Sequence, residues 1–271
     1  MTIRVRAPAT TANVGPGFDS AAIALDLWNE LEVGDGNGPA DLEHLGVRAF
    51  ARLAPVENRT FAFTDRIPRE RGLGSSAAVV ALGLVAGALA AGIDPQPERL
   101  LAEGIELEGH GDNLAAALAG GVCLTWETRI ARIADEPPAL PIAVVPATRL
   151  STPAARAALP SSVLYADAAH TAGRAALLGA ALASGSEELF AAALDDRLHE
   201  PYRAPHVPLL AEVRAAPPAG ALGATISGSG PTVIVWARRS AAKGCADELR
   251  GRFPGLDVLP FSVTSQGAGS A

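Results

Sequence analysis

The chain has 271 residues, 49% of them hydrophobic, which is enough to bury one large core or two modest ones. Aromatic residues make up 4% of the chain and the formal net charge is -7, which excludes platforms of stacked bases and broad binding to a phosphate backbone. Cys123 and Cys245 have no metal-site or redox spacing, and residues 1–15 contain no apolar signal segment. We therefore expect a soluble cytoplasmic protein with no nucleic-acid or membrane partner.

The first half of the chain mixes strand and helix patterns. Apolar and arginine side chains alternate over residues 2–7, which predicts a half-buried strand. The run at 77–92 is apolar but shorter than a bilayer span and contains three glycines, so we expect a helix of the protein core. The remaining predicted elements are an extended stretch at 22–33, a turn cluster at 34–41, a short helix at 42–53, a strand at 59–67, helices at 98–108 and 115–119, and a strand at 122–127.

The segment 135–141, with the sequence DEPPALP, is the strongest linker signal in the chain. We therefore predict two domains, 1–136 and 137–271. The elements predicted in the second domain are a strand at 142–145, helices within 152–196, a helix at 209–215, strands at 223–226 and 232–236, a helix at 241–252 and a strand at 256–263. The composition of 265–271 predicts disorder. Strands mixed with unequal helices favour a two-domain α+β protein.

The sequence RGLGSSAA, residues 71–78, stands directly before the long apolar helix. Gly72 and Gly74 allow positive φ and close approach of a ligand to the backbone. Ser75 and Ser76 follow at the predicted helix N-terminus, where free N–H groups and the helix dipole favour an anion such as phosphate. An ordinary serine-capped helix after a glycine turn is the alternative for this motif alone.

Two further motifs are rich in turn-forming residues. Residues 8–25 contain Asn13, the turn Gly-Pro-Gly, and then Asp19, which an ordinary Asx-capped turn would also explain. Residues 223–236 place SGSGPT, with Gly228 at its centre, between two predicted strands, which a simple hairpin would also explain.

Taken together, PATTANVGPGFD, GLGSSA after Pro68, and SGSGPT resemble the GHMP small-molecule kinases in order and spacing. The chain has neither a Walker-type P-loop nor the full dinucleotide-binding spacing. The resemblance implies an α+β fold of two domains, a ribosomal-protein-S5-domain-2-like N-terminal domain and a ferredoxin-like C-terminal domain. It also implies that ATP and Mg²⁺ are the cofactors, and that the protein forms a homodimer.

Four other runs resemble the homoserine kinases within that superfamily: residues 107–121, 151–160 and 199–203, and the ISGSGPT form of the third motif. Homoserine is a zwitterion with a terminal hydroxyl, so its site needs a cation for the carboxylate and an anion for the ammonium. Arginine supplies planar, bidentate forks for a carboxylate. We assign substrate binding to Asn13, Asp19, Asn113, Arg156, Arg203 and Gly228.

The resemblance also implies roles in phosphoryl transfer. Ser76 and Glu108 would hold Mg²⁺, with Ser75 as the alternative to Ser76. Ser76, Glu108 and Asn113 form the predicted catalytic set. The residues assigned to ATP are Arg71, Gly72, Leu73, Gly74, Ser75, Ser76 and Ala77. No general base is assigned, because Asp112, the nearest aspartate, has an alternative role in bracing Asn113. Direct transfer depends mainly on positioning and charge neutralisation.

The chain departs from the family pattern on the adenine side. The turn 34–41 is shorter than in relatives, and the nearest equivalents of an expected asparagine are Asp41 and the displaced Asn58. Two alternatives therefore stay open: a GHMP kinase for another small alcohol, and a non-catalytic homologue that binds a nucleotide or metabolite.

Overall fold

The computed structural model describes residues 2–37 and 40–271 of the chain. The elements of its first half are β1 (Ile3–Asn13), β2 (Gly17–Asp35), α1 (Leu45–Ala51), β3 (Arg59–Thr64), α2 (Ser75–Ala90), α3 (Pro97–Glu108), α4 (Asp112–Ala119), β4 (Val122–Trp126) and β5 (Arg129–Ala134). Those of the second half are β6 (Leu140–Val145), α5 (Thr152–Ala157), α6 (Tyr165–Ser184), α7 (Glu187–Ala193), α8 (Glu200–Arg203), α9 (Pro208–Ala215), β7 (Ala221–Ile226), β8 (Val233–Ala237), α10 (Ala242–Arg252), β9 (Asp257–Pro260) and β10 (Gly269–Ser270), with short 3₁₀ turns at Ala204–His206 and Arg239–Ala241.

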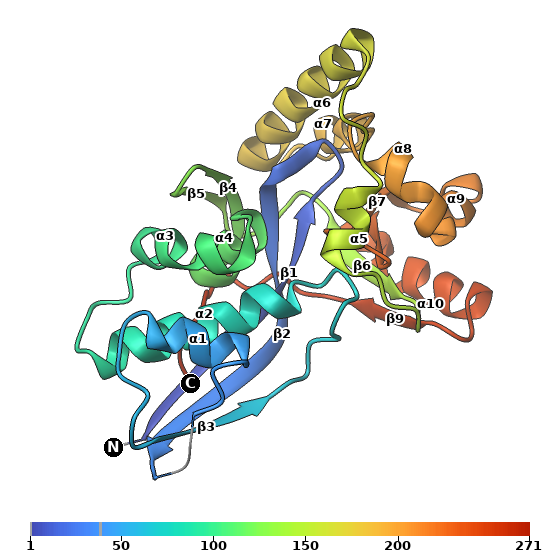
Figure 1. Ribbon diagram of the computed structural model, residues 1–271. Coiled ribbons are helices and arrows are strands. Elements are labelled where there is room, and N and C mark those ends of the chain that lie inside the picture. The colour runs from blue at the N-terminus through green and yellow to red at the C-terminus, as the bar shows by residue number, and fades with distance from the viewer. Residues whose placement is uncertain (1, 38–39) are drawn as a thin grey trace.

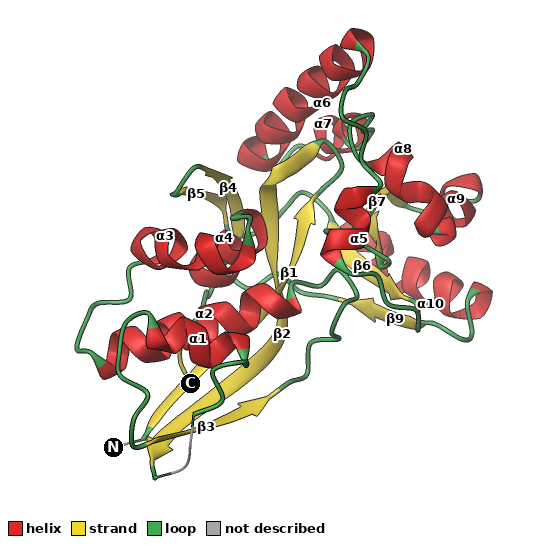
Figure 2. Cartoon of the chain, in the orientation of Figure 1, coloured by secondary structure: helices red, strands yellow, loops and turns green. Residues whose placement is uncertain are grey.

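The strands form two separate antiparallel sheets, which Figure 2 shows with their helices. The first sheet has the order β10-β1-β2-β4-β5, with β3 also paired to β2. The second has the order β7-β8-β6-β9, and together with α10 and the helices between β6 and β7 it has the ferredoxin-like arrangement. The α+β fold in two parts is therefore confirmed.

The helix α2 is buried on all sides in the first half, between β1, β2 and the helices α1, α3 and α4. It is apolar around its whole circumference, as expected of a helix inside a core. Two of its glycines permit close packing against α1: a Cβ on Gly83 would lie 2.1 Å from the Gly46 carbonyl oxygen, and one on Gly87 would lie 2.8 Å from that of Phe50. This packing fixes the direction of α2 and so the place where its N-terminus lies.

The core continues from the first sheet into the second. Trp236 of β8 and Phe190 of α7 are fully buried and belong to the same apolar cluster as α2. Their rings meet edge to face, 5.2 Å apart, and the Trp236 indole donates to Thr225 Oγ1 at 2.9 Å. The two halves therefore share apolar packing, and they lie side by side in Figure 1.

The C-terminal segment differs from expectation. Disorder predicted for 265–271 is wrong, because Gly269 and Ser270 pair with Arg6 and Val5 of β1. The strand predicted at 256–263 ends at Pro260, and the chain then crosses to the first sheet, where Thr264 N donates to the Ala24 carbonyl. A composition of small and polar residues carries no information about free backbone groups on a nearby strand, and these groups hold the segment in place.

Within the described residues, no helix is both long enough and apolar enough to cross a membrane.

Candidate active site

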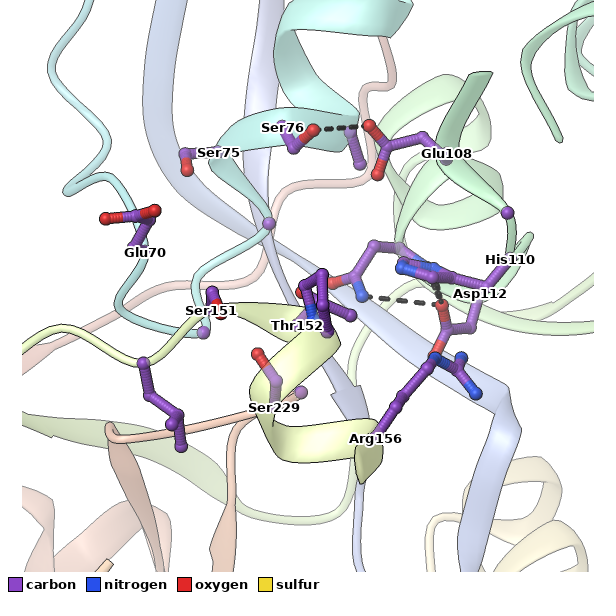
Figure 3. A pocket seen from close by; sticks show the side chains of 18 of the residues that line it. Glu70, Ser75, Ser76, Glu108, His110, Asp112, Ser151, Thr152, Arg156 and Ser229 are labelled. Atoms are coloured by element: carbon purple, nitrogen blue, oxygen red, sulfur yellow. Dashed lines mark hydrogen bonds and ion pairs between the residues drawn. The ribbon is translucent and has the colours of Figure 1, made fainter. Parts of the chain in front are cut away.

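A cavity of about 600 Å³ lies at the boundary between the two sheets (Figure 3), within the usual range for small-molecule sites. It is lined by the β1–β2 turn, the loop before α2, the α3–α4 junction, α5, α8 and the β7–β8 loop. The sequence-predicted residues in its lining are Asn13, Asp19, Gly72, Gly74, Ser75, Ser76, Ala77, Glu108, Asn113, Arg156, Arg203 and Gly228.

The loop before α2 depends on two glycines with left-handed backbone. Gly72 has φ +79°, and a Cβ there would lie 2.2 Å from the carbonyl oxygen of Ser227. Gly74 has φ +66°, and its Cβ would lie 1.9 Å from Thr10 Oγ1. No described side chain caps α2, so the N–H groups of its first turn remain free for an anion in the cavity.

Arg71 and Leu73, predicted as ATP contacts, are not part of the cavity lining. Leu73 is fully buried, and its carbonyl accepts a hydrogen bond from Thr10 N at 3.1 Å. The Arg71 carbonyl accepts from Thr232 N at 3.3 Å. Both residues thus attach the loop to the strands beside it through their backbones, and their role toward ATP stays a prediction.

Ser76 and Glu108, the predicted magnesium ligands, are in direct contact across the cavity wall. Ser76 Oγ donates a hydrogen bond to Glu108 Oε1, drawn as a dashed line in Figure 3. Burial raises the pKa of Glu108, and the hydrogen bond from Ser76 partly opposes that rise. The described residues hold no cluster of three or more His, Cys, Asp or Glu side chains suited to a metal. A hydroxyl and a carboxylate nevertheless suit Mg²⁺, which prefers oxygen and takes further ligands from water and phosphate.

Asn113 and Asp112 open α4 and are both buried. Thr10 Oγ1 donates to Asn113 Oδ1 at 2.7 Å, which fixes the orientation of the amide. Asp112 Oδ1 accepts from Asn113 N at 2.7 Å and lies 3.0 Å from His110 Nδ1. This contact raises the pKa of His110. Because Asp112 is held by both neighbours, its geometry suits bracing of Asn113 better than removal of a proton from a ligand.

Asp19 and Arg156, predicted for opposite ends of a zwitterion, are paired with each other. Arg156 Nη1 and Nη2 donate to the two carboxylate oxygens of Asp19 at 3.1 and 2.8 Å. The hydrogen bonds from the guanidinium to Asp19 raise the pKa of Arg156. Figure 3 shows Arg156 reaching from α5 toward Asp112. The pair is partly exposed, so its partners can be exchanged for those of a ligand at modest cost.

Arg203 lies at the end of α8 and is 2% exposed. Its Nη1 donates to the carbonyl oxygen of Gly228 at 3.0 Å, and Asn13 Nδ2 donates to the same oxygen at 2.8 Å. Burial and the nearby Arg156 lower the pKa of Arg203. Its Nε is buried and has no hydrogen-bond partner among the described residues. Arg203 nevertheless lines the cavity, so its guanidinium places a positive charge beside the space open to a ligand.

Sequence reasoning missed several residues of the lining: Glu70, Leu107, Gly109, His110, Leu150, Ser151, Thr152, Pro153 and Ser229. All but Glu70 and Leu150 stand inside the runs quoted above, where no ligand role was assigned to them. No described residue of 34–60, including Asp41 and Asn58, lines the cavity. The adenine side thus remains without assigned residues, and 38–39 lie outside the described residues.

Comparison with known proteins places these features in a family. Residues 42–121 match the N-terminal domain of the GHMP kinases, and residues 176–255 match their C-terminal domain. The chain is 40% identical over 257 residues to the homoserine kinase of Moorella thermoacetica, covering 86% of this chain and 87% of that protein. It is 39% identical over 296 residues to the homoserine kinase of Streptomyces avermitilis, covering 96% and 97%. The crystal structure of homoserine kinase from Cytophaga hutchinsonii superposes with a TM-score of 0.89 at 27% identity, covering 100% of this chain and 97% of that one. The chain therefore belongs to the GHMP kinases and, within them, to the homoserine kinase family.

Proposed function

We propose that this protein transfers a phosphoryl group from ATP to the side-chain hydroxyl of L-homoserine, giving O-phospho-L-homoserine for threonine biosynthesis. One observation carries the proposal. The same cavity is lined by the glycine loop and the N-terminus of α2, and also by Asp19, Arg156 and Arg203. A phosphate donor and an amino-acid acceptor can therefore bind next to each other, and the named relatives support this choice of acceptor.

The acceptor end has the charges that a zwitterion requires. We assign the carboxylate to Arg203 and Arg156, because both line the cavity and Arg156 offers a bidentate fork. The ammonium is assigned to Asp19. On binding, the contact between Asp19 and Arg156 would be replaced by contacts of each with the acceptor. Asn13 and Gly228 would hold Arg203 and the adjacent turn in place.

The end of the cavity beside the glycine loop suits a nucleoside triphosphate with Mg²⁺. The backbone of Gly72 to Ser76 would bind the phosphates, and Ser76 and Glu108 would hold the metal. When bound, Mg²⁺ neutralises charge on the transferring phosphoryl group. The raised pKa of Glu108 supports this assignment, since a buried carboxylate is stabilised by a nearby cation.

The chain's contribution to the transfer step is positioning. Asn113, whose carbonyl side is fixed by Thr10, can orient the acceptor hydroxyl toward the phosphates. Asp112 is already engaged by His110 and Asn113, so we propose direct transfer without a protein base.

We also propose that the functional units are residues 1–136 and 137–271, joined by the returning C-terminal segment, and that the protein is a cytoplasmic homodimer. Light scattering coupled to size-exclusion chromatography tests the dimer: a molar mass of one chain at working concentration would contradict it.

The function is tested by coupled detection of ADP release with ATP and Mg²⁺. L-Homoserine, L-threonine, L-serine and mevalonate are offered in turn as acceptors. We expect turnover to be fastest with homoserine. Turnover of another alcohol without turnover of homoserine would indicate a different GHMP kinase, and no turnover with any of them would favour a non-catalytic homologue.

A further inference from the structure

His199 is a fully buried histidine directly before α8, and it lies between the β1–β2 turn and Arg203. Its Nε2 lies 2.8 Å from the carbonyl oxygen of Gly15, in the β1–β2 turn. Its Nδ1 lies 3.4 Å from Nη1 of Arg203, on α8. Its ring stacks on Phe18, with centroids 4.9 Å apart and planes inclined by 18°. His199 is not part of the cavity lining, so any effect on a ligand must pass through these neighbours.

The two neighbours determine where the proton of His199 resides. A carbonyl oxygen only accepts and a guanidinium only donates, so Nε2 must carry the proton and Nδ1 must present its lone pair. Asp196 Oδ2, 3.6 Å from Nε2, is a second acceptor on the same side. Burial lowers the pKa of His199 and the Arg203 cation lowers it further, while Asp196, the Gly15 carbonyl and Asp19 act in the opposite direction. The net direction favours the neutral ring.

Both contacts lead to residues assigned above to the acceptor. The turn that includes Gly15 is flanked by Asn13, whose amide donates to Gly228, and by Asp19, whose N–H donates to Asn13 Oδ1 at 3.1 Å. Gly15 also packs closely on Leu194, because a Cβ at Gly15 would lie 2.8 Å from the carbonyl oxygen of Leu194. The side chain of Arg203, on the other side, has only Gly228 and His199 as its hydrogen-bond contacts among the described residues.

We propose that His199, in its neutral Nε2–H form, is a positioning residue that sets the separation of the anion at Asp19 from the cation at Arg203 and so selects the length of the acceptor. It does this by donating to Gly15 and accepting from Arg203. The inference rests on the proposed function, because it takes Asp19 and Arg203 as contacts of an amino-acid acceptor.

Three substitutions separate the contacts. His199→Gln keeps an amide donor near the Nε2 position, His199→Asn keeps an acceptor oxygen near the Nδ1 position, and His199→Leu removes both. We expect His199→Leu to raise the KM for homoserine by about tenfold or more, as for loss of a hydrogen bond to a charged group. The Asn and Gln variants should each recover part of that loss, while the KM for ATP changes by less than about twofold in all three. His206→Leu, in the exposed turn just after α8, is the matched control and should leave both constants unchanged.

Parallel rises in both KM values, or an unchanged KM for homoserine in His199→Leu, would overturn the proposal in favour of a structural role. If the Leu variant does not fold, the Asn and Gln variants decide: an increase confined to the acceptor KM supports the proposal, and unchanged acceptor KM values in both overturn it. Serine is one carbon shorter than homoserine. The preference for homoserine over serine, measured as the ratio of their kcat/KM values, should be smaller in the variants than in the wild type.

A second measurement does not depend on the acceptor. Nitrogen-15 spectra of the labelled histidines at neutral pH should show His199 protonated at Nε2 and unprotonated at Nδ1. A proton on Nδ1 would refute the positioning role even if homoserine is the substrate. Conversely, the expected tautomer together with no turnover of homoserine would contradict the proposed function and leave the contacts of His199 as described.

Discussion

The substitution Gly74→Ala tests the proposed phosphate loop through one added methyl group. Gly74 has φ +66°, and the new Cβ would lie 1.9 Å from Thr10 Oγ1 and 3.2 Å from Asn113 Oδ1. Gly92, at the other end of α2, provides a matched control because it has φ +67° and nothing within 4 Å of the corresponding Cβ. Both substitutions place an alanine in left-handed backbone, but only Gly74→Ala adds a steric clash.

The expected magnitudes follow from these contacts. Left-handed backbone at alanine costs about 1–2 kcal/mol, which is what we expect Gly92→Ala to lose. In Gly74→Ala, Thr10 must also rotate away and leave the buried Asn113 oxygen without its hydrogen bond at 2.7 Å. An unsatisfied buried acceptor costs about 1–3 kcal/mol more. Gly74→Ala should therefore lower the free energy of unfolding by about 2–5 kcal/mol.

Urea unfolding measures the two stabilities, and the KM for ATP measures the loop. We expect Gly74→Ala to raise the KM for ATP by about tenfold or more, because Gly74 precedes the free N–H groups of α2, and Gly92→Ala to leave it unchanged. Equal losses of stability in the two variants, with equal KM values for ATP, would refute both the clash and the assignment of this loop to phosphate.

Three further predictions concern charged residues. Arg203→Leu should raise the KM for homoserine by about a hundredfold and the KM for ATP by less than about threefold, as steady-state kinetics can show; equal increases would mean that Arg203 is not a carboxylate contact. Glu108→Gln should raise the Mg²⁺ concentration for half-maximal rate by about tenfold with little change in the KM for homoserine, and an unchanged magnesium titration would remove Glu108 from the metal site. Glu200 is fully buried beside Arg214, and burial raises its pKa from 4.5 to about 7. Between these values the folded state holds a proton that the unfolded state releases, so stability should fall as pH rises from 5 toward 8, by up to about 3 kcal/mol. In Glu200→Gln, urea unfolding should show a free energy of unfolding without this fall between pH 5 and 8. The same dependence on pH in both proteins would contradict the raised pKa of Glu200.

Much of the site could be predicted because its chemistry lies in short local motifs. Gly72 and Gly74 stand where positive φ and close approach are needed, and their spacing from Ser75 and Ser76 identifies the start of a helix. The boundaries of α2 and α3 were also close to expectation, since a long apolar run and a proline at the helix start are strong signals.

Contacts between distant segments could not be predicted. Nothing local in the sequence indicates that Asp19 pairs with Arg156, 137 positions away, or that His199 meets Gly15. A histidine gives the same local signal whether it is exposed or buried between two motifs. The strand β5 was missed for a related reason, because RIARIA is short and its strand character depends on pairing with β4.

The return of the chain to its first sheet has a consequence for biosynthesis. The segment after β9 donates hydrogen bonds to Ala24 and Ala117, and β10 covers the edge of β1 beside Val5 and Arg6. These partners leave the ribosome long before the residues that complete their sheet, so the edge of β1 stays uncovered until residues 269–270 emerge. An unpaired strand edge is a surface for wrong pairing with another chain. Residues 262–271 would then protect this edge once they emerge, and a nascent chain stalled before them would expose it to wrong pairing.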